Sequence, residues 1–121
     1  MQHLIINGKE YVIIDNVMIA HDDGTSLKYH DAVLYCSLLK NSYDDWRLPT
    51  FDDCHIISTY LTKYHDNRYS WTLTYDADDR ALAFFNGEYD KDLHNQYSMM
   101  GITHNALFCI PVRNILNNNE N

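Results

Sequence analysis

The sequence predicts one α+β domain: a β-hairpin, then two helices, then a loop-rich β region that ends the chain. The length of 121 residues fits one domain, and 45% hydrophobic residues suffice for a packed core. Asn7-Gly8 between two apolar runs is the strongest two-residue hairpin signal. Apolar residues recur at helical spacing in 29–40 and 51–63, and strand-like alternation follows.

The N-terminal region is predicted to be a hairpin from His3 to Asp15. Both turn positions, Asn7 and Gly8, suit the positive φ that a type I′ turn requires. A further short apolar run covers Val17–Ala20, and residues 21–25 indicate a turn.

Two helices are predicted next. The first covers Tyr29–Lys40 and places apolar residues on one face, namely Ala32, Tyr35, Cys36 and Leu39. The second covers Phe51–Lys63, with Thr50 as its N-cap and Asp53 at the third helical position. Its inward stripe consists of Cys54, Ile57 and Leu61.

The remaining chain is predicted to hold strands and long loops. Tyr69–Tyr75 alternates with Trp71 and Leu73 on one side, and Ala81–Phe85 forms a second apolar run. The polar stretch Glu88–Gly101 is expected to be a long loop.

The end of the chain is predicted to be one strand and a tail. The strand covers Ala106–Val112, where Pro111 indicates an edge or a bulge. The domain thus spans residues 1–113, and the Asn-rich residues 114–121 form a flexible tail.

Charge excludes two classes of partner. Nine Lys and Arg face seventeen Asp and Glu, which gives a net charge of −8. This charge opposes direct binding to nucleic-acid phosphates and docking on anionic membranes. No apolar run has the roughly 18 residues of a membrane helix, and no signal peptide is recognisable. We therefore expect the chain in the cytoplasm of the producing cell, or on a virion that leaves by lysis.

Cysteines and histidines indicate neither an enzyme nor a metal protein. The three Cys form no CxxC pair, and the seven His show no ligand spacing. Cys54 and His55 are adjacent, but helix neighbours do not face each other, so they form no nucleophile–base pair. We expect no catalytic residue, no cofactor and no metal.

Four segments, in order, resemble the C-terminal domain family of the Legionella collagen-like adhesin. Residues 31–39 resemble its "A..YC..L" helix, and residues 45–50 match its "DWRLPT" signature. Residues 69–72 resemble its "YWSS/T" strand, and residues 108–113 resemble its closing "RCVR" strand. The resemblance spans roughly Val17 to Asn114. "DWRLPT" is fairly specific, whereas the other segments are weak singly.

The resemblance implies a C-type-lectin-like fold, with two helices on a twisted antiparallel sheet and long loops. It also implies a binding module for sugars or proteins, of a kind found in surface adhesins and phage tail proteins. In such folds a disulfide often joins the first helix to the last strand. Cys36 and Cys109 occupy the matching positions, so we expect them to be adjacent, and whether they are bonded stays open.

The signature segment and its neighbours are interpreted as structural. We expect Trp46, Leu48 and Trp71 in the core, Arg47 in a hydrogen-bond network and Pro49 at the helix entry.

The ligand is expected on two loops, from Tyr75 to Arg80 and from Glu88 to Gly101. Tyrosines would supply rigid contact area, and acidic residues would supply hydrogen bonds. The predicted binding residues are Tyr75, Asp76, Asp78, Asp79, Arg80, Glu88, Tyr89, Asp90, Asp92 and Tyr97. The function indicated is non-enzymatic recognition of a host or phage protein, or of a surface glycan.

Two alternatives stay open. The acidic pairs, which chiefly aid solubility, are also compatible with a small phage-type inhibitor that binds a host defence or nucleic-acid-handling protein, with an acidic face that imitates DNA. The alternating loop acids are also compatible with Ca²⁺, although no EF-hand spacing is present. A homo-oligomer is compatible with the resemblance because adhesin relatives assemble, but no heptad repeat supports one.

Overall fold

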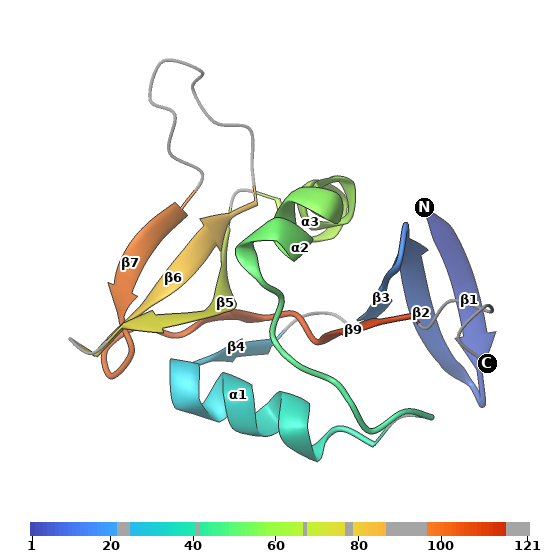
Figure 1. Ribbon diagram of the computed structural model, residues 1–121, viewed down its shortest axis with the longest axis horizontal. Coiled ribbons are helices and arrows are strands. Elements are labelled where there is room, and N and C mark those ends of the chain that lie inside the picture. The colour runs from blue at the N-terminus through green and yellow to red at the C-terminus, as the bar shows by residue number, and fades with distance from the viewer. Residues whose placement is uncertain (22–24, 41, 67, 77–78, 87–96, 116–121) are drawn as a thin grey trace.

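The chain folds into a small α+β arrangement in this computed structural model (Figure 1). The structure describes residues 1–21, 25–40, 42–66, 68–76, 79–86 and 97–115, and within these ranges there are two β-sheets and three helices. The α+β class predicted from the sequence is therefore confirmed.

The first sheet is antiparallel and begins with the predicted hairpin. Asn7 and Gly8 adopt φ values of 51° and 78°, as a type I′ turn requires. The strand at the far edge comes from the end of the chain, which brings the hairpin and the C-terminal strand together as predicted. The strands, in spatial order, are β1 (Gln2–Ile6), β2 (Lys9–Ile14), β3 (Val17–Ala20) and β9 (Val112–Asn114).

Both faces of this sheet are buried at its centre. Successive side chains of a strand point to opposite faces. Val12 and Ile19 belong to one core cluster, whereas Tyr11 and Met18 belong to another. The short apolar run of β3 is therefore buried at all four positions.

The second sheet takes strands from distant parts of the chain, in the order β4-β8-β5-β6-β7. Its pairings are antiparallel except for β5 with β8, which are parallel where Ser70 faces Phe108. The expectation of one antiparallel sheet is therefore wrong. The bounds are β4 (Thr25–Leu27), β5 (Tyr69–Asp76), β6 (Arg80–Phe85), β7 (Tyr97–Gly101) and β8 (Leu107–Cys109).

The single strand predicted for residues 106–112 is also wrong. The strand breaks at Ile110-Pro111, so that β8 lies in the second sheet and β9 in the first. Pro111 has no amide hydrogen to donate to a ladder, but its carbonyl accepts the Ala20 amide at 3.0 Å. Figure 1 shows this segment, in orange to red, crossing between the two sheets.

Two other details of the β region differ from the predictions. The end of the predicted loop 88–101 forms β7, which pairs with β6, while residues 87–96 lie outside the described residues. Trp71 and Leu73 do not share a face: Trp71 is fully buried, and Leu73 is exposed. The register of β5 shifts between Trp71 and Tyr75, and such an irregularity breaks the simple alternation.

The helices are α1 (Tyr29–Leu38), α2 (Phe51–Ile56) and α3 (Ser58–Tyr64). The second predicted helix is thus divided at Ile57, whose φ of −96° and ψ of 18° are not helical. Ile56, Ile57 and Thr59 are β-branched and weaken a helix at this point. The predicted stripe of Cys54, Ile57 and Leu61 is nevertheless fully buried.

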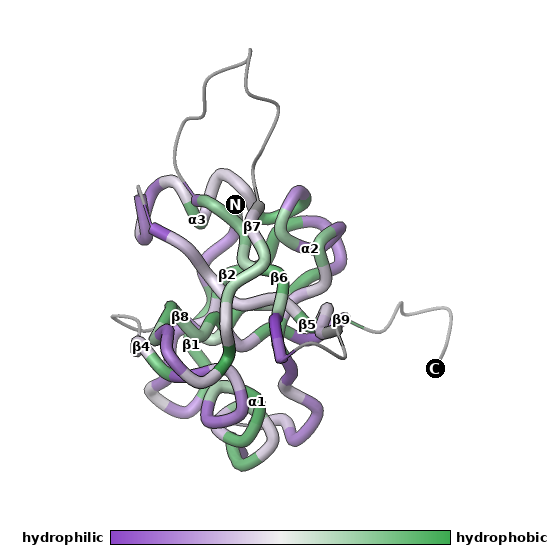
Figure 2. The backbone as a smooth tube through the Cα atoms, turned by 90° about the vertical axis from the view of Figure 1, so that its left-hand side faces the viewer, coloured by the Kyte–Doolittle hydropathy of each residue, from purple (hydrophilic) through white to green (hydrophobic). Residues whose placement is uncertain are grey.

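The helices lie at opposite ends of the molecule. Figures 1 and 2 both place α1 at the bottom and α2 with α3 at the top, with strands between them. The side of α1 that bears Ala32 and Cys36 packs against the cluster of Trp46 and Trp71. Helices α2 and α3 cover the other cluster, around Phe84 and Val112.

The predicted start of the tail, at residue 114, is wrong because Asn114 and Ile115 are held by the first sheet. Asn114 pairs with Val17 in the first sheet, and the Ile115 amide donates to the Asn16 carbonyl at 2.8 Å. Residues 116–121 lie outside the described residues.

Candidate functional site

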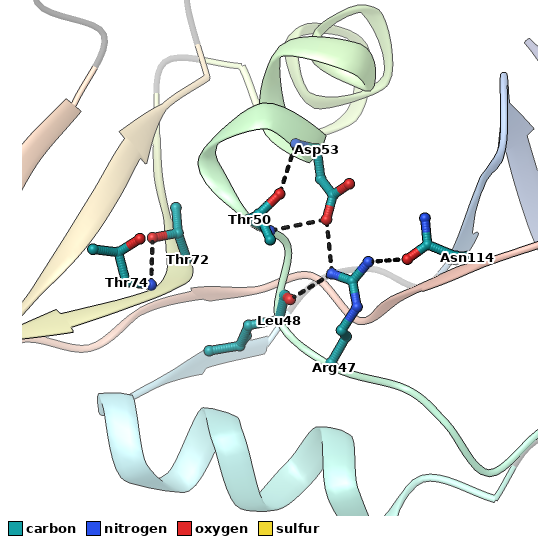
Figure 3. Close-up of polar contacts among 7 residues, drawn as sticks. All are labelled: Arg47, Leu48, Thr50, Asp53, Thr72, Thr74 and Asn114. Carbon is teal, nitrogen blue, oxygen red and sulfur yellow. Dashed lines mark hydrogen bonds and ion pairs between the residues drawn. The ribbon is translucent and has the colours of Figure 1, made fainter.

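The signature segment forms a polar junction at the centre of the fold (Figure 3). Arg47 donates through Nη1 to Asp53 Oδ2 at 2.7 Å and to the Leu48 carbonyl at 3.1 Å. Its Nη2 donates to the side-chain oxygen of Asn114 on β9. The Thr50 amide donates to Asp53 Oδ2 at 2.9 Å, and the Asp53 amide donates to Thr50 Oγ1 at 3.0 Å. This predicted cap and the arginine therefore tie α2 to the first sheet.

Electrostatics keeps the Asp53 carboxylate charged. Burial raises its pKa, but the hydrogen bond from Thr50 and the Arg47 guanidinium outweigh burial and bring the pKa below its usual range. Trp46, Leu48 and Pro49 are buried around the junction, in line with their predicted structural role. A carboxylate and a guanidinium that satisfy each other leave little capacity for a ligand.

A second arginine anchors the first residue of the signature segment, Asp45. Arg113 on β9 donates to Asp45 Oδ1 at 2.6 Å through Nε and to Oδ2 at 3.2 Å through Nη2. Its guanidinium also lies 3.8 Å from the ring centroid of Tyr43. The hydrogen bond from Arg113 lowers the pKa of Asp45. Arg47, within the connection between α1 and α2, and Arg113, on β9, thus both join this connection to β9.

Cys36 and Cys109 are adjacent, as the resemblance implies. Their Sγ atoms lie 3.6 Å apart, well beyond the roughly 2.05 Å of a disulfide, and both are free thiols. Trp71, also predicted to be structural, is fully buried and donates its indole hydrogen to the Leu27 carbonyl at 2.7 Å.

Tyr75, one of the predicted binding residues, lies against the core of the domain. Its ring stacks on Tyr29, with centroids 5.6 Å apart and an angle of 10° between the planes. Tyr29 is buried, packs edge-on against Trp71 and donates its hydroxyl to the Leu73 carbonyl at 3.1 Å. Burial, and then the neighbouring Tyr75, raise the pKa of Tyr29. Tyr75 remains 45% exposed, so its ring is both held by the core and accessible.

A cleft of about 240 Å³ lies next to this tyrosine. It is lined by Lys28, His30, Asp31, Ile102 and Thr103. The His30 ring lies 6.1 Å from the Tyr75 ring, which joins the cleft to the stacked pair.

The cleft also borders the predicted loop 75–80. The Ile102 amide donates to the Asp79 carbonyl at 3.1 Å, and the Tyr75 hydroxyl donates to Asp79 Oδ1 at 3.3 Å. Asp79 has a φ of 59°, a left-handed conformation that Asp tolerates better than most residues. The cleft is smaller than the roughly 300–1,000 Å³ of drug-sized sites, so it suits one ring or one side chain. We refer to Tyr75, His30 and this cleft together as the tyrosine site.

The remaining predicted binding residues have different outcomes. Arg80 opens β6 and pairs with Gly101 on β7 and with Asp76 on β5. Asp78, Glu88, Tyr89, Asp90 and Asp92 lie outside the described residues, as do the side chains of Asp76 and Tyr97.

Sequence reasoning missed Lys28, His30 and Asp31 as neighbours of the predicted loop. They precede or begin α1, more than forty positions before Tyr75, and no local pattern connects the two segments. The adjacent aromatic rings of Tyr29 and His30 were the one available signal.

Two further clefts lie elsewhere on the surface. One of about 460 Å³ is lined by Lys40, Ser42, Tyr43, Asp44, Asp45 and Arg113. Its arginine is already engaged by Asp45 and Tyr43. Another of about 200 Å³ is lined by Lys9, Glu10, Tyr11, Ala20, His21, Tyr35 and Leu39.

Cys54, the cysteine next to His55, is fully buried. Burial raises the pKa of the Cys54 thiol far above neutrality, so it carries no thiolate nucleophile. Within the described ranges, no three His, Cys, Asp or Glu side chains are grouped so that they could hold a metal ion. Over the same part of the chain, every helix is too short or too polar to cross a membrane.

Comparison of the chain with models of known protein families and with curated protein sequences found no match. The resemblance to the adhesin domain family therefore stays a prediction.

Proposed function

We propose that this protein is a non-enzymatic recognition module with a C-type-lectin-like fold, which binds a protein or a glycan at the tyrosine site. One observation carries the proposal: Tyr75 is exposed, and yet its ring is fixed by the buried Tyr29. A pre-ordered aromatic ring loses little conformational entropy on binding, which is why tyrosine is common at recognition surfaces.

The chemistry around the ring suits a polar ligand group. His30, Asp31 and Thr103 offer hydrogen-bond donors and acceptors, and Lys28 offers a positive charge. A sugar ring or one side chain of a partner protein would fit the cleft and pack against Tyr75.

The test compares binding by the wild type with binding by Tyr75→Ala and His30→Ala. Immobilised protein is presented with a bacterial lysate and with purified surface polysaccharides, and bound material is identified by mass spectrometry or sugar analysis. We expect one ligand class to be retained by the wild type and lost by both variants. Ile5→Ala is the matched control, because Ile5 is 72% exposed and lies on the hairpin. Unchanged binding by both tyrosine-site variants would contradict the proposal.

The second candidate, an acidic inhibitor of a host protein, is favoured by the net charge of −8. Its association should slow markedly as salt rises, because charge would steer the encounter. A site built on tyrosine should respond little. The association rate of the recovered partner, measured at low and high salt, distinguishes the two candidates.

A further inference from the structure

Helix α1 is apolar on both sides. One side bears Ala32 and Cys36, which are buried. The other side bears Leu34 and Leu38, which are 54% and 66% exposed and lie one turn apart. A surface helix normally presents polar residues to water, so two exposed leucines on one side of α1 indicate a surface that can receive a partner. Figure 2 shows α1 at the lower edge of the molecule, with hydrophobic positions along its turns.

We refer to Val33, Leu34, Ser37 and Leu38 as the outer face of α1. All four are exposed. The Ser37 hydroxyl donates to the Leu34 carbonyl at 2.9 Å, so it keeps a hydrogen bond if the face is covered. Ser37 is also small, and a small residue between leucines lets another helix approach closely.

Charges at the two ends of this face are opposite. Asp31 is exposed in the first turn, and exposed Lys40 follows the last turn. In an antiparallel pair of α1 helices related by a twofold axis, the Asp31 end of one copy lies beside the Lys40 end of the other, and Leu34 lies opposite Ser37. The two ends of the face are therefore complementary in charge.

The local charge balance also permits self-association. The whole chain carries −8, so two copies repel each other across most of their surfaces. Between residues 28 and 40, in contrast, Lys28 and Lys40 flank a single acid, Asp31, and the next acids, Asp44 and Asp45, line a cleft with Lys40. This is a surface on which two copies can meet without an excess of acidic groups.

We propose that the outer face of α1 is a dimer interface, on which a second copy of this chain packs its own α1 antiparallel. A ten-residue helix is only about 15 Å long, so the interface is small and the dimer is weak. This inference does not rest on the proposed function, although Asp31 lies at the edge of both surfaces.

The test is sedimentation equilibrium of the full chain, from low micromolar to several hundred micromolar protein. We expect a reversible rise from 14.3 kDa to twice that mass. Leu34→Glu and Leu38→Glu should each weaken dimerisation at least about tenfold, because each buries a charge in the apolar contact. Ile5→Glu is the matched control and should dimerise as the wild type does. Circular dichroism confirms that each variant is folded.

A charge exchange tests the antiparallel arrangement. Asp31→Lys and Lys40→Asp should each weaken the dimer by placing like charges opposite each other, and the double variant should restore it. A wild type that stays monomeric throughout, or a dimer that Leu34→Glu and Leu38→Glu leave unchanged, would overturn the proposal. Failure of the double variant to restore association would overturn the antiparallel packing.

Discussion

The Arg47 junction and the outer face of α1 lie close in sequence but differ in every physical respect. At the junction, charged groups are withdrawn from water, and Arg47, Asp53 and Thr50 satisfy one another. On α1, in contrast, the apolar side chains of Val33, Leu34 and Leu38 remain exposed to water. A cluster of charged side chains can thus serve the fold alone, whereas exposed apolar side chains leave a surface that a partner could cover.

The largest effect should come from breaking the junction. Asp53→Ala removes the partner of Arg47 and the acceptor of the Thr50 amide, and leaves a partly buried guanidinium without its carboxylate. We expect the free energy of unfolding to fall by about 3 kcal/mol, measured by urea denaturation. The neighbouring exposed Asp52→Ala is the control and should cost less than about 0.5 kcal/mol. Equal losses for both variants would show that the junction is not structural.

Acid should weaken the junction by protonating the same carboxylate. The pKa of Asp53, like that of Asp45, is lower in the folded protein than its usual value, near 3.9 in an unfolded chain. Their stabilising contribution is therefore complete above about pH 5 and is lost as the pH falls below about 4. The melting temperature should drop in this range, and it should drop less in Asp53→Ala. An equal drop in that variant would assign the acid sensitivity to other groups.

A smaller effect is expected at the cap alone. Thr50→Ala removes the hydroxyl that accepts the Asp53 amide but keeps the ion pair with Arg47. We expect a loss of about 1 kcal/mol in thermal or urea unfolding. Thr59→Ala, at an exposed position inside α3, provides the comparison and should have little effect. If Thr50→Ala lowered the free energy of unfolding no more than Thr59→Ala does, the cap would not contribute to stability.

The smallest effect on stability should come from the outer face of α1. Leu38 is 66% exposed, so Leu38→Gln should change the unfolding free energy by less than about 0.5 kcal/mol. The measurement belongs at low micromolar protein, where a weak dimer is dissociated. If Leu38→Gln lowered the free energy of unfolding by several kcal/mol at this concentration, Leu38 would be part of the core. The outer face of α1 would then resemble the Arg47 junction in serving the fold.

The sequence by itself determined the elements whose signals are local. The Asn7-Gly8 turn depends on the φ of two adjacent residues, and the Thr50–Asp53 cap depends on groups three positions apart. The buried stripe of α2 and α3 follows from a regular period, although the break at Ile57 shows that the period does not fix where a helix divides.

Tertiary structure decided what depends on distant partners. The strand ending at Cys109 and the one beginning at Val112 enter different sheets, because β8 pairs with β4 and β5 whereas β9 pairs with β3. Tyr29 meets the Leu73 carbonyl 44 positions away, and this contact joins α1 to the tyrosine site. The exposed leucines of α1 fit its helical period as well as the buried residues do. Only the packing of α1 against one core cluster distinguishes its two sides. The spacing of apolar residues is a local property of the sequence, whereas burial depends on the whole fold.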